Sequence, residues 1–354
     1  MTENGKLLLL PPCAIPKPGE NITWFEGNRR MQGVLLGYDI DERPIIINKF
    51  GLPTQATSFA LIRLSDPFDR IEPNWMRLPP QGKIFLPSED VTEVFKKKLA
   101  ERIPPGPSYI ELISEIFYRG FEVFLVGGTV RDIIQGDKSN DIDIVTTMPL
   151  KLSLPLLKSM FNQEIHHNKK TGFIRIGGSP SSGDPFVDVK NFPIYNPGGK
   201  TAIFGSDFSA DLKLRDFSCN AVYYDPINNS LIDPSGTGIE DAQKKKLTII
   251  KDADAQSPLY HSATIVIRLV KFVSRGYSCP QHTVEEIRSK FCPLLPTMSV
   301  AERIRYLNAQ ILNKAQIGNR VQAYENFAEA MSKLGLKEEY NTYFKPIEEL
   351  LNLK

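Results

Sequence analysis

The sequence predicts an α+β fold, and three regions of the 354-residue chain support that prediction. Short apolar runs separated by turn-rich breaks fill residues 1 to 85, which is typical of a small β-rich module. Residues 121 to 146 show the pattern of a strand, a glycine turn, a short helix and a second strand. Residues 251 to 354 contain several stretches with helical periodicity. We therefore expect a mixed sheet with helices, preceded by a small β-rich module and followed by a helical region.

The composition leaves room for two or three domains, because 41% of the residues are hydrophobic and 24% are charged. With 43 basic and 41 acidic residues the net charge is +2, so any contact with nucleic acid must come from a local patch. The four cysteines lack CxxC spacing, which predicts reduced core thiols and no zinc site. No apolar run reaches the ~20 residues of a membrane span, and no signal-peptide pattern occurs, so we expect a cytoplasmic protein without a membrane partner.

Two interpretations of the module at residues 1 to 85 remain open. The module could bind a nucleic acid or a protein partner, which exposed Trp24, Arg29 and Arg30 would favour. It could instead be a structural buttress, since aromatic residues in short strands usually belong to the core. Residues 86 to 107 then form a predicted helical linker that ends in a Pro-Pro-Gly-Pro break.

Predicted helices flank this break. Ser88 followed by acidic residues, with lysines toward the end of the segment, predicts a helix from Ser88 to Ile103. The amphipathic pattern of Tyr109 to Tyr118 predicts a second helix that leads into the first strand of the region from 121 to 146.

Two aspartates carry the chemistry of the region from 121 to 146. Asp141 and Asp143 are two residues apart on a predicted strand, so their side chains leave the same face at roughly 6.6 Å spacing along the backbone. Two such carboxylates can converge on hard divalent cations that promote displacement at phosphorus. At Gly127 and Gly128 the absence of side chains lets backbone N–H groups approach phosphate oxygens at the start of a helix.

The order of these motifs resembles a known family. LVGGTVRD at 125 to 132 followed by DID at 141 to 143 is similar to the LVGGxVRD and DxD signature of class II CCA-adding tRNA nucleotidyltransferases and bacterial poly(A) polymerases. The resemblance implies a polymerase β-like nucleotidyltransferase head over residues 108 to 250, with Mg²⁺ as cofactor. It also nominates Asp188, in the predicted strand from 186 to 189, as a third catalytic carboxylate and metal ligand beside Asp141 and Asp143.

A second motif lies at residues 211 to 221. DLKLRDFSCNA resembles the family pattern DLxRRDFTINA, and the resemblance assigns the triphosphate and the ribose to Arg215, Asp216 and Asn220. Arginine presents a planar fork to phosphate oxygens, while Asp and Asn can pair with sugar hydroxyls. Before this motif, the Gly-, Pro- and Lys-rich stretch from 191 to 206 is interpreted either as a mobile flap or as an ordinary surface loop.

The resemblance weakens after residue 257. Family members continue with EDPLRxLRAVRFAARLGF, whose acid and arginine form a protein template for the incoming base. Arg268 and Lys271 fit the second half of this pattern. In that register His261, Ser262 and Ile265 occupy the positions of the Glu, the Asp and the templating Arg. An alternative alignment at residues 257 to 260 also lacks the acid and arginine pair, so base choice does not follow from family rules.

The resemblance implies transfer of a nucleoside monophosphate from a ribonucleoside triphosphate to an RNA 3′ end, with tRNA as the family's commonest acceptor and pyrophosphate as product. The nucleotide-binding residues that it implies are Gly127, Gly128, Arg131, Asp132, Arg215, Asp216, Asn220, Arg268 and Lys271. Two alternatives stay open: a specialised enzyme of toxin or defence type that modifies tRNA or a protein hydroxyl, and an inactive nucleotide-binding regulatory protein. The retained carboxylates argue against the inactive protein.

Overall fold

The protein contains two compact units. The computed structural model describes residues 18–26, 29–39, 44–48, 53–55, 62–63, 78–103, 106–119, 121–138, 142–162, 165–168, 172–177, 186–194, 203–205, 208–253, 261–314 and 319–351. Residues 1–213 and 221–236 form the first unit, and residues 214–220 and 237–354 form the second. The first unit contains two β-sheets and the second is mainly helical. The predicted α+β class is confirmed, with a small N-terminal sheet, a mixed central sheet and a helical C-terminal region.

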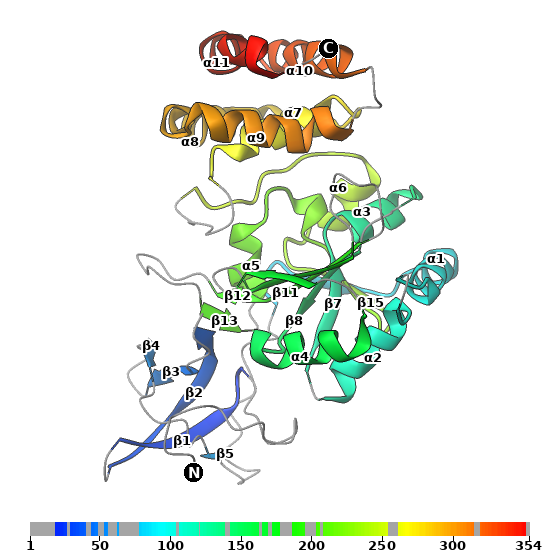
Figure 1. Ribbon diagram of the computed structural model, residues 1–354, viewed down its shortest axis with the longest axis vertical. Helices are drawn as coiled ribbons and strands as arrows, with labels where there is room; N and C mark the ends of the chain where they lie inside the picture. Colours follow the sequence, from blue (N-terminus) through cyan, green and yellow to red (C-terminus); the bar gives the residue numbers. More distant parts are fainter. Residues whose placement is uncertain are drawn as a thin grey trace. The chain divides into compact units, whose positions relative to one another are not determined.

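The central sheet of the first unit has the strand order β6-β15-β14-β7-β8-β11-β10-β9 (Figure 1). Strands β8 and β11 are parallel and the other neighbouring pairs are antiparallel. Apolar and β-branched residues in VFLV and IDIVT suit β7 and β8 to its buried centre. The strands are β6 Lys83–Phe85, β7 Val123–Val126, β8 Ile142–Thr146, β9 Ile165–Asn168, β10 Phe173–Gly177, β11 Phe186–Asn191, β14 Tyr223–Asp225 and β15 Ser230–Asp233.

Serine caps begin the first two helices of this unit. The hydroxyl of Ser88 accepts from the backbone N–H of Val91, and Ser108 forms a reciprocal capping box with Glu111. The first helix ends at Ala100, earlier than the predicted Ile103, because the following prolines disfavour helical backbone and Arg102 pairs with Ser108 in a β-bridge. The helices are α1 Glu89–Ala100, α2 Tyr109–Tyr118, α3 Gly128–Gln135, α4 Leu150–Met160 and α5 Phe208–Leu214.

The small sheet combines N-terminal strands with two strands from residues 193–205. Strand β13 pairs with β2, where Phe204 lies opposite Tyr38. Within the stretch from 191 to 206, which was expected to be a flap or a surface loop, residues 193–194 and 203–205 are therefore strands. The first pairs with the second and the second with β2, which gives their backbone groups partners, and residues 195–202 lie outside the described set. Trp24, Arg29 and Arg30 lie on strands, but their side chains are outside the described set. The strands are β1 Asn21–Glu26, β2 Arg29–Asp39, β3 Pro44–Asn48, β4 Pro53–Gln55, β5 Ile62–Arg63, β12 Pro193–Ile194 and β13 Ile203–Gly205.

The C-terminal helices of the second unit lie in two layers, with α7, α8 and α9 in one and α10 and α11 in the other (Figure 1). A capping box between Ser299 and Glu302 begins α9. No helix in the described part of the chain has the length and hydropathy needed to cross a membrane. The helices are α6 Gly238–Gln243, α7 Thr264–Val273, α8 Gln281–Lys290, α9 Val300–Gln310, α10 Arg320–Lys333 and α11 Lys337–Glu339.

Candidate active site

The turn between β7 and α3 has the backbone that the glycine motif predicts. Gly127 has φ +78°, a conformation that side-chain-bearing residues rarely adopt, and its carbonyl accepts from the N–H of Arg131. A Cβ added at Gly128 would come no closer than 3.7 Å to the Arg131 guanidinium. The fold therefore requires glycine at 127, whereas at 128 a Cβ would make only an ordinary van der Waals contact.

Two predicted nucleotide-binding side chains pair with each other on α3. Nε and Nη2 of Arg131 both donate to Oδ1 of Asp132, at 2.8 and 2.5 Å. The Arg131 side chain is 10% exposed and that of Asp132 is 23% exposed. Asp132 therefore orients the arginine, and a direct contact of either residue with a nucleotide stays a prediction.

The central sheet places two of the three predicted catalytic carboxylates next to each other. Asp143 on β8 and Asp188 on β11 are register partners in the parallel pair, so both side chains leave the same face from strands ~4.8 Å apart. The same cross-strand row continues through Arg175 on β10 to His166 on β9. Asp141, the third predicted carboxylate, lies outside the described residues.

Two basic side chains that lie outside the sequence motifs bind these carboxylates. Arg175 holds Asp188 with both ends of its fork, Nε to Oδ1 and Nη2 to Oδ2, each at 2.7 Å. Lys190 Nζ donates to Asp143 Oδ1 at 3.0 Å. Alternation along β10 places Arg175 on one face, but only the register of β10 against β11 brings it opposite Asp188.

The carboxylate pair combines opposing electrostatic influences with oxygen donors that suit a divalent cation. Burial raises the pKa of Asp188, hydrogen bonding from Arg175 and the charge of Lys190 oppose that rise, and the charge of Asp143 adds to it. Mg²⁺ prefers carboxylate oxygens, so the donor chemistry of Asp143 and Asp188 fits this metal. Among the described residues no group of three or more His, Cys, Asp or Glu side chains forms a possible metal centre. Asp141 does not belong to the described residues.

The second unit contains a separate cluster around Asp216. One carboxylate oxygen accepts from the Phe217 N–H at 2.8 Å and from Asn220 Nδ2 at 2.9 Å. The other binds Arg268, with Nε at 2.6 Å and Nη2 at 2.5 Å. Burial alone would raise the pKa of Asp216, but the charge of Arg268 and these hydrogen bonds outweigh it and lower the pKa. Asp216 thus fixes Asn220 and Arg268, while contacts of these residues with ribose or phosphate stay predictions.

Three other basic side chains of the second unit differ in burial and in their charged or polar neighbours. Lys271 is buried and donates to Gln310 at 2.8 Å, so its ammonium group already has a protein partner. Arg215 is half-buried. Lys251, which belongs to no recognised motif, has a pKa that burial lowers and that the charges of Asp216 and Asp252 partly restore. Triphosphate binding by Arg215 and Lys271 stays a prediction.

The positions that correspond to the family's base template hold structural residues. Ile265 is 1% exposed in the core of α7. Nδ1 of His261 accepts from the N–H of Ala263 at 3.2 Å, and Nε2 lies 2.9 Å from the hydroxyl of Thr297. His261 therefore stabilises the start of α7, and a buried isoleucine cannot form the polar contacts of a templating arginine.

Comparison with known proteins gives concordant results. Residues 123–248 match the model of the Poly A polymerase head domain. A CCA-adding enzyme of Geobacillus thermodenitrificans is 29% identical over 201 residues, covering 56% of this chain and 47% of the relative. A CC-adding tRNA nucleotidyltransferase of Shouchella clausii is 29% identical over 168 residues, covering 47% of this chain and 38% of the relative. The chain thus spans about half or less of the length of these curated relatives.

Solved structures show the same fold. The CCA-adding enzyme of Bacillus stearothermophilus, solved with CTP, matches with a TM-score of 0.51 at 22% identity. The match covers 69% of this chain and 55% of the chain of that structure. A tRNA nucleotidyltransferase, solved with a primer tRNA and an incoming ATP analogue, has a TM-score of 0.50 at 18% identity. This second match covers 68% of this chain and 65% of that structure.

Proposed function

Because this chain carries a Poly A polymerase head domain and is a distant homologue of CCA-adding enzymes, we propose that it is an active nucleotidyltransferase. It transfers a nucleoside monophosphate from a ribonucleoside triphosphate to an RNA 3′ end, preferably that of tRNA, and releases pyrophosphate. The observation that carries this proposal is the register pairing of Asp143 with Asp188 on adjacent strands.

We propose that Asp143 and Asp188, together with Asp141, hold Mg²⁺ through carboxylate oxygens. When bound, the ion supplies Lewis-acid stabilisation of the reacting phosphoryl group. The contribution of the chain is to hold Asp143 and Asp188 in advance on one face of the sheet, with Asp188 buried. Asp188 is also a candidate to accept the proton of the attacking hydroxyl, because burial raises its pKa.

The proposed triphosphate contacts begin at the N-terminus of α3, where Gly128 carries no side chain that would keep phosphate oxygens from the backbone. In the second unit Asp216 holds Arg268 in one orientation, which lowers the entropy cost of binding an anion. The side chains that we assign to nucleotide binding are Arg131, Asp132, Arg215, Asp216, Asn220, Arg268 and Lys271.

We propose that base selection does not use the family's template positions. Ile265 is buried there, and His261 is bonded to the protein on both ring nitrogens. Either another part of the chain selects the base or selection is loose, so the nucleotide used must be measured. A nucleic-acid or protein partner for residues 1 to 85 and a cytoplasmic location also remain proposals.

Labelled transfer tests this function. Purified protein is incubated with Mg²⁺, each labelled ribonucleoside triphosphate in turn and total RNA, beside an Asp141→Ala/Asp143→Ala control. Label on a tRNA-sized RNA that is lost in the control supports the proposal and identifies the base. Label on protein would indicate the protein-modifying enzyme, whereas nucleotide binding without transfer would indicate the regulatory protein.

A further inference from the structure

Two carboxylates of the proposed metal site, those of Asp143 and Asp188, form ion pairs with basic side chains of the chain itself. Arg175 forms a two-pronged ion pair with Asp188, and Lys190 forms an ion pair with Asp143. The Arg175 and Asp188 side chains are 21% and 9% exposed, so water screens this pair only in part. The Lys190 and Asp143 side chains are 28% and 31% exposed.

Strand register explains why these cations are present. Asp143 and Asp188 lie directly opposite each other, and like charges in such a pair repel. Arg175 is the next residue in the same row, and Lys190 lies two residues after Asp188 on β11. Each can reach a carboxylate without leaving the sheet, so the chain compensates its own charge repulsion.

A divalent cation at Asp143 and Asp188 would need the same carboxylate oxygens. It would also experience repulsion from a guanidinium and an ammonium group only a few ångströms away in a partly buried site. Both cations also lie against the ring of Phe173, a contact that does not use the carboxylate oxygens. The ring centroid lies 5.2 Å from Cζ of Arg175 and 5.9 Å from Nζ of Lys190.

We propose that Arg175 and Lys190 are displaceable counter-ions that compete with the divalent cation for Asp188 and Asp143 and thereby weaken metal binding. This inference rests on the proposed function, since it concerns the same carboxylates. Neither cation belongs to the recognised motifs. Because of these two side chains, the protein needs a higher divalent-ion concentration to fill the metal site than the carboxylates alone would require.

Mn²⁺ binding to the full-length protein, followed by the EPR signal of free Mn²⁺ without nucleotide or RNA, tests the proposal. Arg175→Met and Lys190→Met remove the charge and retain much of the apolar stem. Each is expected to bind Mn²⁺ about fivefold or more tightly than the wild type, at constant pH and ionic strength. Lys190→Met changes a partly exposed residue, so it provides a test even if Arg175→Met impairs folding.

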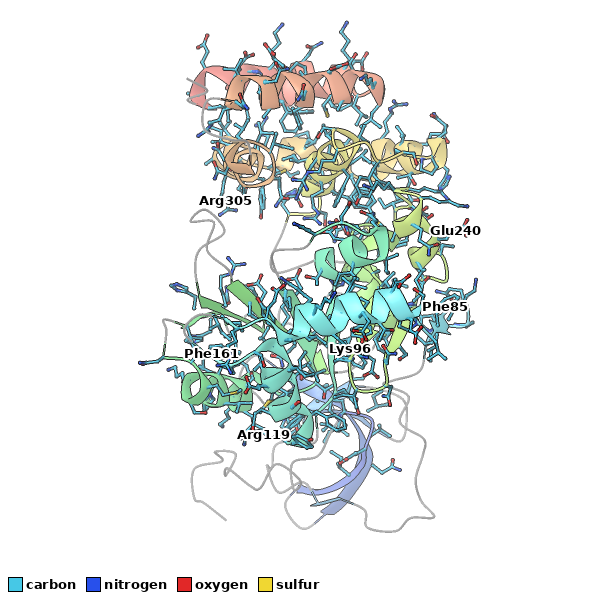
Figure 2. All side chains as sticks on the ribbon, turned by 90° about the vertical axis from the view of Figure 1, so that its right-hand side faces the viewer. Phe85, Lys96, Arg119, Phe161, Glu240 and Arg305 are labelled. Carbon is cyan, nitrogen blue, oxygen red and sulfur yellow. The ribbon has the colours of Figure 1, made fainter. Side chains whose placement is uncertain are left out.

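Two matched controls lie elsewhere in the first unit, on α1 and at the end of α2 (Figure 2). Lys96 pairs with Glu93 at 2.8 Å and Arg119 pairs with Glu115 at 3.4 Å. Lys96→Met and Arg119→Met are expected to leave Mn²⁺ affinity unchanged.

Equal or weaker Mn²⁺ binding in Arg175→Met or Lys190→Met, with the variant folded, would overturn the proposal for that side chain. Absence of Mn²⁺ binding in the wild type and in both variants would instead remove the metal site itself. The proposed function would then fail with it, which is a distinct result from unchanged affinity.

Discussion

Some residues of this protein make contacts that stabilise the fold and are also proposed to bind the nucleotide. Asp216 belongs to a motif that implies ribose contact, yet both of its oxygens accept from Phe217, Asn220 and Arg268. Gly127 and Gly128 are adjacent, yet only the first has a backbone conformation that demands glycine. Substitution of such residues can therefore separate an effect on stability from an effect on nucleotide binding.

Replacement of Asp216 is expected to lower stability in a pH-dependent way. The pKa of Asp216 is lower in the folded chain than in the unfolded chain, so its stabilising effect is complete above the unfolded pKa and is lost as pH falls through the folded pKa. Asp216→Asn should lower the free energy of unfolding by about 2 kcal/mol at pH 7, and the difference should shrink below about pH 4. Urea unfolding over a pH series measures it. A difference that is the same at pH 7 and pH 3 would contradict this assignment.

The two glycines of the β7–α3 turn are expected to respond differently to alanine. Gly127→Ala forces a strained backbone and should lower the unfolding free energy by about 1–3 kcal/mol. Gly128→Ala meets no closer contact than 3.7 Å and should leave stability nearly unchanged, yet it should weaken binding of a ribonucleoside triphosphate several-fold. Thermal unfolding and fluorescent-nucleotide titration measure the two effects. Unaltered nucleotide affinity in Gly128→Ala would exclude phosphate binding at this turn.

At the scale of elements, helix caps stabilise single helices and strand registers decide which side chains become neighbours. Helix α2 precedes strand β7, and its capping box consists of Ser108 and Glu111. The β10–β11–β8 register brings together charges from three strands. Strands β12 and β13 extend the small sheet from a stretch far away in sequence.

Loss of the α2 cap is expected to have a measurable cost. Ser108 is 7% exposed, and its hydroxyl accepts from the N–H of Glu111. Ser108→Ala should therefore lower the free energy of unfolding by about 1 kcal/mol. Ser289→Ala provides a control, because this exposed serine on α8 only bonds back to the carbonyl of Glu286. Urea unfolding compares the two variants, and equal stability of both would refute the capping contribution.

At the scale of the whole molecule, the second unit depends on a short segment that is remote in sequence from its helices. Residues 214–220 belong to that unit, although residues 221–236 return to the first. Phe217 is fully buried and packs edge-on against Phe272, with ring centroids 5.8 Å apart. The hydroxyl of Ser218 donates to Asp241, and its N–H donates to the carbonyl of Thr248.

A fragment of residues 237–354 is therefore expected to unfold without a cooperative transition. It would lack Phe217, the Asp216 partner of Arg268 and the Ser218 partner of Asp241. A variant that joins residues 214–220 to 237–354 through a Gly-Ser linker restores those contacts and should regain cooperative melting. Circular dichroism melts measure both. A sharp melt of the shorter fragment would show that the segment is dispensable.

The motifs of the candidate site could be predicted because they depend on local chemistry. The strand–glycine–helix–strand pattern at 121 to 146 corresponds to β7, α3 and β8, and the conformation of Gly127 follows from glycine's freedom at positive φ. The start of α9 at Ser299 depends on an equally local signal, since a capping box spans only four residues.

The sequence by itself indicated the candidate carboxylates and predicted the glycine turn between β7 and α3. Only the tertiary structure decided that Asp188 lies opposite Asp143, that Arg175 and Lys190 neutralise them, and that residues 193–205 contribute strands to the N-terminal sheet. Alternation along a strand assigns a side chain to a face but does not specify the neighbouring strand or its register. Those choices depend on burial and hydrogen bonding summed over the folded chain.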